Sequence, residues 1–377
     1  MMPSLILSAM TRPESLWEAW GRVQRGGRAP GMDGVTLAAF DRHAERELAR
    51  LREELRGGTY RPWPTRRVGL PKADGSTRAI GIQAVRDRVA QRALLLQIQP
   101  RIEASLEDCS FAFRPRRSVE MALARLDGLR ASGFSWVARA DVTLCFDSLD
   151  RSLLEQRLQA IVPEEEVHRL VTLWLTAGAV DESGWAAPER GVPQGDVLSP
   201  LLCNLYLDPF DEAVCRPAHP LVRYADDFIL AGRTERDVRR GLALAEQELT
   251  GLGLVLNARK QWVGTFSQGF EYLGAAVIGS LRLPLHRHER PGHPPQYTFQ
   301  YGDPLPRQPS RLPAVPPLLT TERALRERMV ELLRAERSGC LLSPMNLALL
   351  HAWQEAGALP QPPRPVEPES WQSVYLI

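Results

Sequence analysis

Apolar residues recur every three to four positions over three long stretches of this chain, a spacing typical of amphipathic helices. The stretches are 85–106, 118–131 and 235–252. A fourth helix is predicted to run from Ser199 toward Val214, with Ser199 as its N-cap and Pro200 in its first turn. Much of the chain is therefore predicted to be helical.

Short runs of β-forming and apolar residues, typical of strands, lie next to three acidic residues in the middle of the chain. Residues 134–142 are mostly β-forming and bring Asp141 to the end of a predicted strand. Further along, two short apolar runs flank Asp226 and Asp227, which predicts a hairpin with both acids at its tight turn. Strands interleaved with helices in this way predict an α+β fold.

Asp226 and Asp227 form the most informative pair of side chains in the sequence. Adjacent carboxylates repel each other and lose hydration at a turn unless a cation offsets the cost. Together with Asp141 they offer the hard oxygen ligands that Mg²⁺ prefers, and two Mg²⁺ ions suit phosphoryl transfer. Taken alone, an Asp-Asp pair is more simply a solvated turn. The third carboxylate, at a strand end, is what favours a metal site.

Short motifs accompany these acids in a fixed order. Asp141 is followed by Phe146, then by Gly-Val-Pro-Gln-Gly at 191–195 and Tyr-Ala-Asp-Asp at 224–227. These resemble successive palm motifs of reverse transcriptases of the group II intron type. Further segments that resemble motifs of that family, in its order, are 31–34, 70–78, 87–91, 111–115, 252–257 with Lys260, and 270–274. Residues 111–115 read Phe-Ala-Phe-Arg-Pro, a mild departure from the family's Tyr-Gly-Phe-Arg-Pro.

The resemblance implies a right-hand polymerase fold of the α+β class, with helical fingers and a palm of antiparallel sheet packed on helices. Residues 1–135 are expected to be an N-terminal extension and fingers. Residues 136–278 are expected to be the palm, with fingers elements interleaved. The dense prolines of 279–320 predict a linker. Residues 321–377 are expected to form a short helical region that is thumb-like or docks a partner.

The resemblance also implies roles for individual residues. Asp141, Asp226 and Asp227 are the expected catalytic acids, and Val142 joins them as a metal ligand. The expected cofactor is a pair of Mg²⁺ ions, with Mn²⁺ able to substitute. The residues expected to bind the incoming nucleotide are Lys72, Arg78, Phe146 and Gln194. Those expected to contact nucleic acid are Arg114, Arg116, Arg117, Phe270, Leu273 and Gly274.

Lysine usage singles out two residues independently of the family. Of the 47 basic residues, only Lys72 and Lys260 are lysines. Lysine offers a compact charge and a proton that can be released near neutral pH, and arginine offers neither. We therefore expect Lys72 to hold the incoming triphosphate and Lys260, counted among the catalytic residues, to protonate the leaving pyrophosphate.

Composition limits the remaining possibilities. The net charge is +2, so nucleic-acid binding must rest on local basic patches rather than on total charge. The five cysteines show no CxxC spacing, which favours neither a zinc site nor a disulfide framework. The N-terminus has no signal-peptide pattern and no stretch approaches a membrane span. A cytoplasmic, prokaryotic enzyme without membrane partners is expected.

The implied partners are an RNA template, a DNA or RNA primer and deoxynucleotides. Residues 269–274 and 280–284 are most similar to reverse transcriptases associated with CRISPR systems, so CRISPR integrase subunits and spacer acquisition from RNA are also expected. Free-standing group II intron-type, retron-type and phage-defence enzymes are alternative settings. An RNA-dependent RNA polymerase is an alternative enzyme class, but it usually has a polar residue at the position of Phe146. A non-catalytic nucleic-acid-binding module would not need three acids and two lysines.

Overall fold

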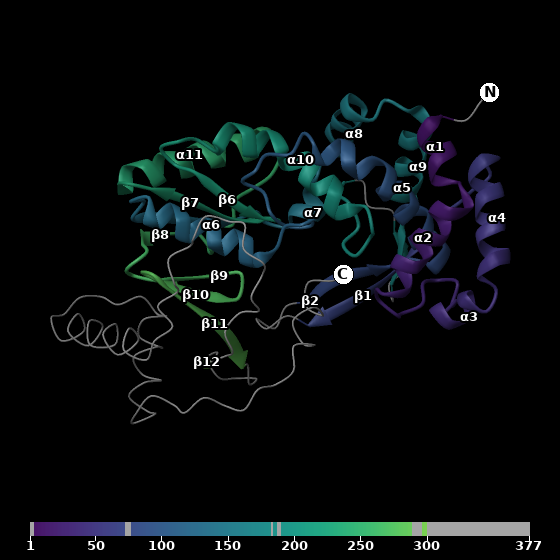
Figure 1. Cartoon of the computed structure of the whole chain (residues 1–377), viewed down its shortest axis with the longest axis horizontal. Coiled ribbons are helices and arrows are strands. Elements are labelled where there is room, and N and C mark those ends of the chain that lie inside the picture. The colour runs from purple at the N-terminus through teal and green to yellow at the C-terminus, as the bar shows by residue number, and fades with distance from the viewer. Residues whose placement is uncertain (1–3, 72–76, 182–183, 187–189, 289–295, 300–377) are drawn as a thin grey trace.

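The palm sheet is the layer that carries the predicted acids. The computed structural model describes residues 4–71, 77–181, 184–186, 190–288 and 296–299. The palm strands are β3 (Trp136–Asp141), β6 (Leu221–Tyr224), β7 (Asp227–Gly232) and β8 (Trp262–Thr265). They lie in the order β6-β7-β3-β8, and each neighbouring pair is antiparallel (Figure 1).

Side chains alternate across this sheet, so it has a packed layer on each face. Ala138, Ala140 and Phe228 belong to the core shared with α10 (Ser199–Val214) and α11 (Glu235–Gly251). Their neighbours along the strands, among them Val137, Val222 and Ile229, belong to a second core shared with α6 (Val119–Ala131). The palm sheet is thus packed on helices, as predicted, and its second face also packs against Phe270, Tyr272 and Val277.

The N-terminal helices and two later ones form a bundle, on the right in Figure 1, whose core is continuous with that of the palm. Its members are α1 (Leu5–Met10), α2 (Pro13–Gln24), α3 (Leu37–Asp41), α4 (Ala44–Arg56), α5 (Val85–Glu103) and α9 (Glu165–Thr176). β1 (Thr65–Pro71) and β2 (Thr77–Ile82) form an antiparallel hairpin beside the bundle, and β4 (Ala179–Asp181) pairs in parallel with β1 and antiparallel with β5 (Gly184–Ala186). Between the bundle and the palm lie α7 (Cys145–Ser148) and α8 (Arg151–Ile161).

The segment predicted as a proline-rich linker begins differently from that expectation. A third sheet, in the order β12-β11-β10-β9, contains β9 (Phe270–Tyr272), β10 (Ala275–Ile278), β11 (Leu281–His288) and β12 (Gln296–Phe299). Regular structure therefore continues beyond residue 278, through β11. Pro284, which lacks an N–H, lies where pairing with β10 ends and pairing with β12 begins, so the strand tolerates it. The helical region predicted over 321–377 lies outside the described residues.

Most predicted helices are confirmed within three residues at each end, and one cap is wrong. α5, α6 and α11 match the stretches 85–106, 118–131 and 235–252. α10 begins at Ser199, but its N-cap is Leu198, which makes no side-chain capping hydrogen bond. Ser199 is instead buried inside the first turn, next to Pro200. Among the helices that the structure describes, none has the length and apolar character needed to cross a bilayer.

Candidate active site

Two neighbouring strands bring the three predicted acids to one end of the palm sheet. β3 and β7 pair in a register that sets Asp141 opposite Asp227. Tyr224 pairs with Asp227, so Asp226 is the second residue of a two-residue turn and Asp227 is already in β7. The predicted hairpin is confirmed, but only one of its two acids lies in the turn itself. The Val142 N–H donates to the Asp226 carbonyl at 3.1 Å, which ties the turn to the end of β3.

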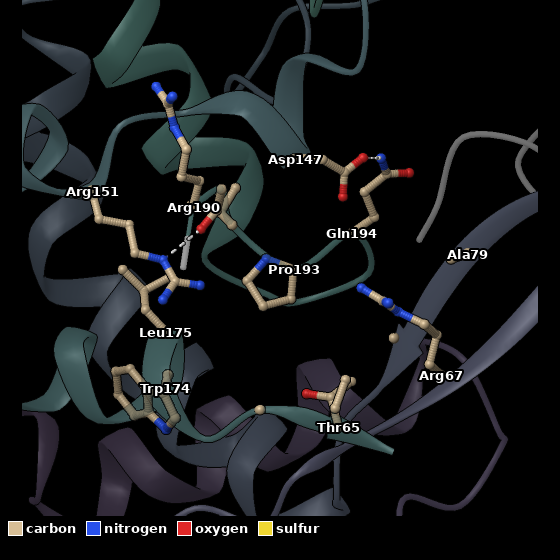
Figure 2. Close-up of a pocket in the computed structure, with 15 residues that line it drawn as sticks. Thr65, Arg67, Ala79, Asp147, Arg151, Trp174, Leu175, Arg190, Pro193 and Gln194 are labelled. Atoms are coloured by element: carbon tan, nitrogen blue, oxygen red, sulfur yellow. Dashed lines mark hydrogen bonds between the residues drawn. The ribbon is translucent and has the colours of Figure 1, made fainter. Parts of the chain in front are cut away.

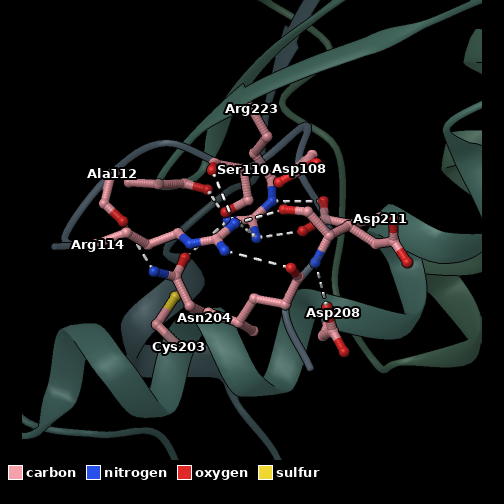
Figure 3. A network of polar contacts seen from close by, with 12 residues as sticks. Asp108, Ser110, Ala112, Arg114, Cys203, Asn204, Asp208, Asp211 and Arg223 are labelled. Carbon is pink, nitrogen blue, oxygen red and sulfur yellow. Dashed lines mark hydrogen bonds and ion pairs between the residues drawn. The ribbon is translucent and has the colours of Figure 1, made fainter. Parts of the chain in front are cut away.

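The buried side chain of Arg223 stabilises this turn through hydrogen bonds. The turn bends through Ala225, whose φ of 58° is in the left-handed region. Arg223 is almost fully buried, and it donates to the Ala225 carbonyl at 2.8 Å. It also donates to Asp211 Oδ1 at 2.6 Å, as Figure 3 shows. Burial opposes the charge of Arg223, but the buried Asp211 beside it raises the arginine's pKa above its usual range. The ion pair anchors the acidic turn to α10.

Asp227 is held by an arginine that the motif reading did not single out. Arg139 Nη2 lies 3.1 Å from Asp227 Oδ2, and its Nε lies 3.4 Å from Oδ1. Burial is the main cause that raises the pKa of Asp227 to about 6, and Asp226 and Asp141 add to it while Arg139 opposes it. Crowding of three carboxylates is thus felt at this residue even with an arginine in contact.

Asp141 has one oxygen in a salt bridge and one without a hydrogen bond. Lys260 Nζ donates to Asp141 Oδ2, and the Lys260 side chain is 60% exposed. Asp141 itself is only 7% exposed, and its Oδ1 is buried with no hydrogen-bond partner among the described residues. Leaving a buried carboxylate oxygen unsatisfied is costly, so this atom fits a ligand of positive charge.

The donor set fits Mg²⁺ in chemistry, although no cage is preformed. Carboxylate and carbonyl oxygens are the ligands that Mg²⁺ takes, and it is often held by only one or two carboxylates. Within the described ranges, no three His, Cys, Asp or Glu side chains are arranged as a metal cluster. Lys260 on Asp141 and Arg139 on Asp227 supply positive charge in that arrangement.

Phe146 lies directly beyond β3, on α7. The chain turns into α7 through Leu144, whose φ is 46°, and the half-buried Phe146 packs edge-to-face on Phe113 with ring centroids 6.4 Å apart. An aromatic contact of this geometry limits the movement of the Phe146 ring. The Phe146 ring is therefore held in a fixed position, five residues beyond Asp141 in the sequence.

The loop 191–195 is pinned against α7 and places Gln194 beside it. The Val192 N–H donates to the Phe146 carbonyl at 2.8 Å, and a Cβ at Gly191 would lie 2.6 Å from that same carbonyl. Gln194 Nε2 donates to Asp147 Oδ2 at 2.8 Å (Figure 2). The loop and Asp147 line a pocket together with Thr65, Arg67, Arg151, Trp174 and Arg190.

Arg78, predicted to bind the incoming nucleotide, lies in the hairpin next to this pocket. Lys72 lies outside the described residues. Arg78 belongs to β2 and pairs with Leu70 of β1, and only its backbone is described. Nearby, the Gly81 N–H donates to the Gln194 carbonyl at 2.7 Å, so β2 is tied to the pocket loop.

The three predicted nucleic-acid arginines differ sharply in environment. Arg114 is buried, pairs with Glu103 at 2.8 Å, and donates to backbone carbonyls of the loop before it. Arg117 pairs with Asp108 at 2.6 Å and lies over the Phe111 ring. Arg116 is exposed. Of the three, Arg116 is therefore the best placed for a phosphate, and Arg114 supports the loop that carries it.

The predicted primer-holding segment is buried at Phe270 and reaches its tip at a turn where Leu273 is half-buried and Gly274 is exposed. Phe270 is buried and packs on Trp262 and Phe266, with ring centroids 5.6 Å apart in both pairs. Leu273 and Gly274 form the two-residue turn between β9 and β10, with φ values of 50° and 73°. Two positive φ values fit the type I′ turn that joins twisted strands. Any contact with a primer falls to this tip.

Three residues of the site were missed by the motif reading. Arg139 lies two residues before Asp141, on the same face of β3, and that spacing is a signal that could have found it. Asp147 follows Phe146 directly and gave no signal of its own. Tyr272 donates to the Asp227 carbonyl at 3.3 Å and to the Val222 carbonyl at 3.2 Å, a contact that depends on how two sheets pack.

Comparison with protein families gives one match over most of the described chain. Residues 70–277 match the model of the family described as reverse transcriptase (RNA-dependent DNA polymerase). That range contains the three acids, Phe146, Gln194 and Lys260.

Individual relatives agree with this match. The chain is 32% identical over 315 residues to protein YkfC of Escherichia coli, covering 72% of this chain and 82% of YkfC. It is 28% identical over 206 residues to the group II intron-encoded protein LtrA of Lactococcus lactis, covering 54% of this chain but 34% of LtrA. The match thus spans about a third of that intron-encoded protein.

Among solved structures, one similar chain is a telomerase from Candida albicans in complex with a fragment of telomeric RNA. The identity is 14%, the TM-score is 0.47, and the match covers 58% of this chain and 46% of the telomerase.

Proposed function

Because this chain belongs to the reverse transcriptase (RNA-dependent DNA polymerase) family, we propose that it extends a primer 3′-hydroxyl with deoxynucleotides copied from an RNA template, at the acids of the palm. The main support for this location of the active site is that Asp141, Asp226 and Asp227 lie together at one end of the palm sheet. One buried oxygen of Asp141 also has no hydrogen-bond partner among the described residues.

Asp141, Asp226 and the backbone carbonyl of Val142 are the groups that would hold Mg²⁺, with Asp227 supporting them. When bound, the metal lowers the pKa of the primer hydroxyl and neutralises charge on the triphosphate. Asp227 keeps its position through Arg139 and Tyr272, and the Arg223–Asp211 pair fixes the turn that presents Asp226. The fold thus orients the acids before any substrate arrives.

Lys260 is the proposed proton donor to the leaving pyrophosphate. Its ammonium group reaches Asp141 from the exposed side of the site, so it is both close to the acids and open to a substrate. Arginine at this position would keep the charge but not the transferable proton. Lys72 and Arg78 are proposed to hold the triphosphate.

Phe146 and Gln194 are proposed to select and orient the nucleotide. The Phe146 ring, fixed by Phe113 and by the loop bonded to its carbonyl, would leave no room for a ribose 2′-hydroxyl. Gln194 would contact the sugar. Arg116 and the Leu273–Gly274 turn are the proposed contacts to the nucleic-acid backbone, with Arg114, Arg117 and Phe270 supporting them.

The test is primer extension by Asp226→Ala on an RNA template with a DNA primer and Mg²⁺. We expect no extension while the thermal unfolding transition is kept, since Asp226 lies in a turn and not in the core. Asp41→Ala, which removes an exposed acid from α3, is the control and should extend at the parent rate. Activity of Asp226→Ala within about tenfold of the parent, roughly 1.4 kcal/mol of barrier, would refute the assignment.

The relatives favour a free-standing, group II intron-type enzyme as the biological setting. LtrA is an intron-encoded protein by name, and so is the COX1 intron 1 protein of Saccharomyces cerevisiae, which is 28% identical over 80% of this chain. The expected role in CRISPR spacer acquisition with integrase subunits finds no support in these relatives. Co-purification of the full chain with integrase subunits from its own locus would be needed to revive it.

A further inference from the structure

A groove lined by three arginines lies on the fingers, apart from the three acids of the palm. It has a volume of about 500 Å³ and is lined by Arg50, Glu54, Thr59, Arg61, Pro62, Trp63, Pro64 and Arg86. Its most unusual feature is Trp63, whose surface is 47% exposed. Trp63 therefore presents a large aromatic surface to solvent beside arginines.

The backbone holds Trp63 in place from both sides. Pro62 and Pro64 flank it, so φ is fixed at both neighbours and Trp63 itself is restricted to extended conformations. The Trp63 N–H donates to the buried Asp87 Oδ2 at 2.9 Å, which anchors the segment to α5. The indole is therefore a platform on a rigid support and loses little conformational freedom when a flat group stacks on it.

The charges around the ring are predominantly positive. Three arginines line the groove against one glutamate, Glu54, which pairs with Arg50 at 2.9 Å and with Arg86. Arg61 is exposed and donates through Nη1 to the Tyr60 carbonyl at 2.8 Å, which leaves its other guanidinium N–H groups for a ligand. A planar ligand that carries negative charge fits this combination.

We propose that this groove binds single-stranded RNA of the template ahead of the pairing position, with a base stacked on Trp63 and phosphates on Arg61 and Arg50. Aromatic platforms beside positive charge are the usual means of holding single strands without sequence preference. The proposal rests on the proposed function. It also rests on continuity, because Pro64 is followed by Thr65 and Arg67, which line the pocket of Gln194. Along an extended strand, Trp63 and Arg67 are about 13 Å apart, a distance of a few nucleotides.

A protein partner is the rival occupant, and the groove is poorly suited to it. Its apolar surface consists of one indole and two prolines, while its rim is arginine. Protein docking sites have a larger apolar centre.

The test is binding of labelled primer–template duplexes, measured by fluorescence anisotropy without nucleotides. One duplex is blunt and the other carries a 5′ template overhang of about eight nucleotides. We expect Trp63→Ala to weaken the overhang complex about tenfold, leave the blunt complex unchanged, and be largely rescued by Trp63→Phe. Trp17→Ala, which removes a tryptophan equally exposed on α2, is the matched control and should change neither affinity.

Charge gives a second measure of the same contact. Arg61→Ala should lower the salt dependence of overhang binding by about one phosphate contact. Equal affinities of parent and Trp63→Ala for the overhang, or equal losses on both duplexes, would overturn the proposal and assign the groove to another partner. Since binding is measured without catalysis, a failed primer-extension test and a failed groove test can be told apart.

Discussion

Asp196→Asn is expected to stabilise the protein at alkaline pH and to leave it unchanged at acidic pH. Asp196 follows the pocket loop and is buried, where Gln91 Nε2 lies 3.3 Å from its Oδ2 and its Oδ1 has no partner among the described residues. Burial is the main cause that raises the pKa of Asp196 to about 7; Asp87 adds to it and Gln91 opposes it. The fold therefore prefers this carboxyl in its neutral form.

The raised pKa of Asp196 sets the pH range in which this carboxyl destabilises the fold. A carboxyl whose pKa is raised by folding contributes its stability fully below its ordinary value of 3.8, and loses it as pH rises through about 7. The difference between the two pKa values corresponds to on the order of 4 kcal/mol at pH 8. Asparagine has nearly the same shape and no charge, so Asp196→Asn removes that penalty.

Urea unfolding of parent and Asp196→Asn between pH 4 and pH 8 would measure the effect. The two curves should nearly agree at pH 4, separate between about pH 4 and pH 7, and keep a constant difference above that. Asp87→Asn is the contrasting variant: the pKa of Asp87 is raised to about 6 by burial, but both its oxygens accept hydrogen bonds, from Tyr60 and from the Trp63 N–H. An amide cannot accept both, so Asp87→Asn should lose stability at acidic pH. Parallel profiles for parent and Asp196→Asn would refute the reasoning.

Three further outcomes are expected. Phe146→Ala should raise incorporation of ribonucleotides relative to deoxynucleotides, because it removes the wall that Phe113 holds in place; an unchanged ratio of kcat/KM values would rule out a steric gate. Lys260→Arg should slow the chemical step in pre-steady-state kinetics with little change in nucleotide affinity, and a parent-like rate would show that the proton donor lies elsewhere. Gly195→Ala should destabilise the protein by about 1–3 kcal/mol in urea, since φ is 103° and the new Cβ would lie 2.4 Å from the Gly81 carbonyl; equal midpoints would contradict this.

The features that sequence predicted well are those set by neighbours along the chain. The hairpin of Asp226 follows from two apolar runs around a short turn, and the helices α5, α6 and α11 follow from their periodicity.

The features that sequence missed depend on contacts between distant segments. Arg139 reaches Asp227 only because β3 and β7 pair in one particular register. The burial of Arg114 depends on the loop that folds over it, and motif membership gave no sign of that. β11 forms because β10 and β12 offer partners on either side, whereas its proline content by itself favoured a linker. Propensity yields to pairing where a sheet is already present.

β3 is hydrogen-bonded along both edges, to β7 and to β8, so it is released only when the whole sheet opens. A slip of one residue would turn Arg139 and Asp141 to the face packed against α11, where an uncompensated charge is very costly. Molecules in which β3 is only partly paired, or paired in a shifted register, are therefore not expected to accumulate as weakly active species. Thermal inactivation of the enzyme should coincide with the cooperative melting of its palm, and lost activity then reports the fraction of molecules that have unfolded.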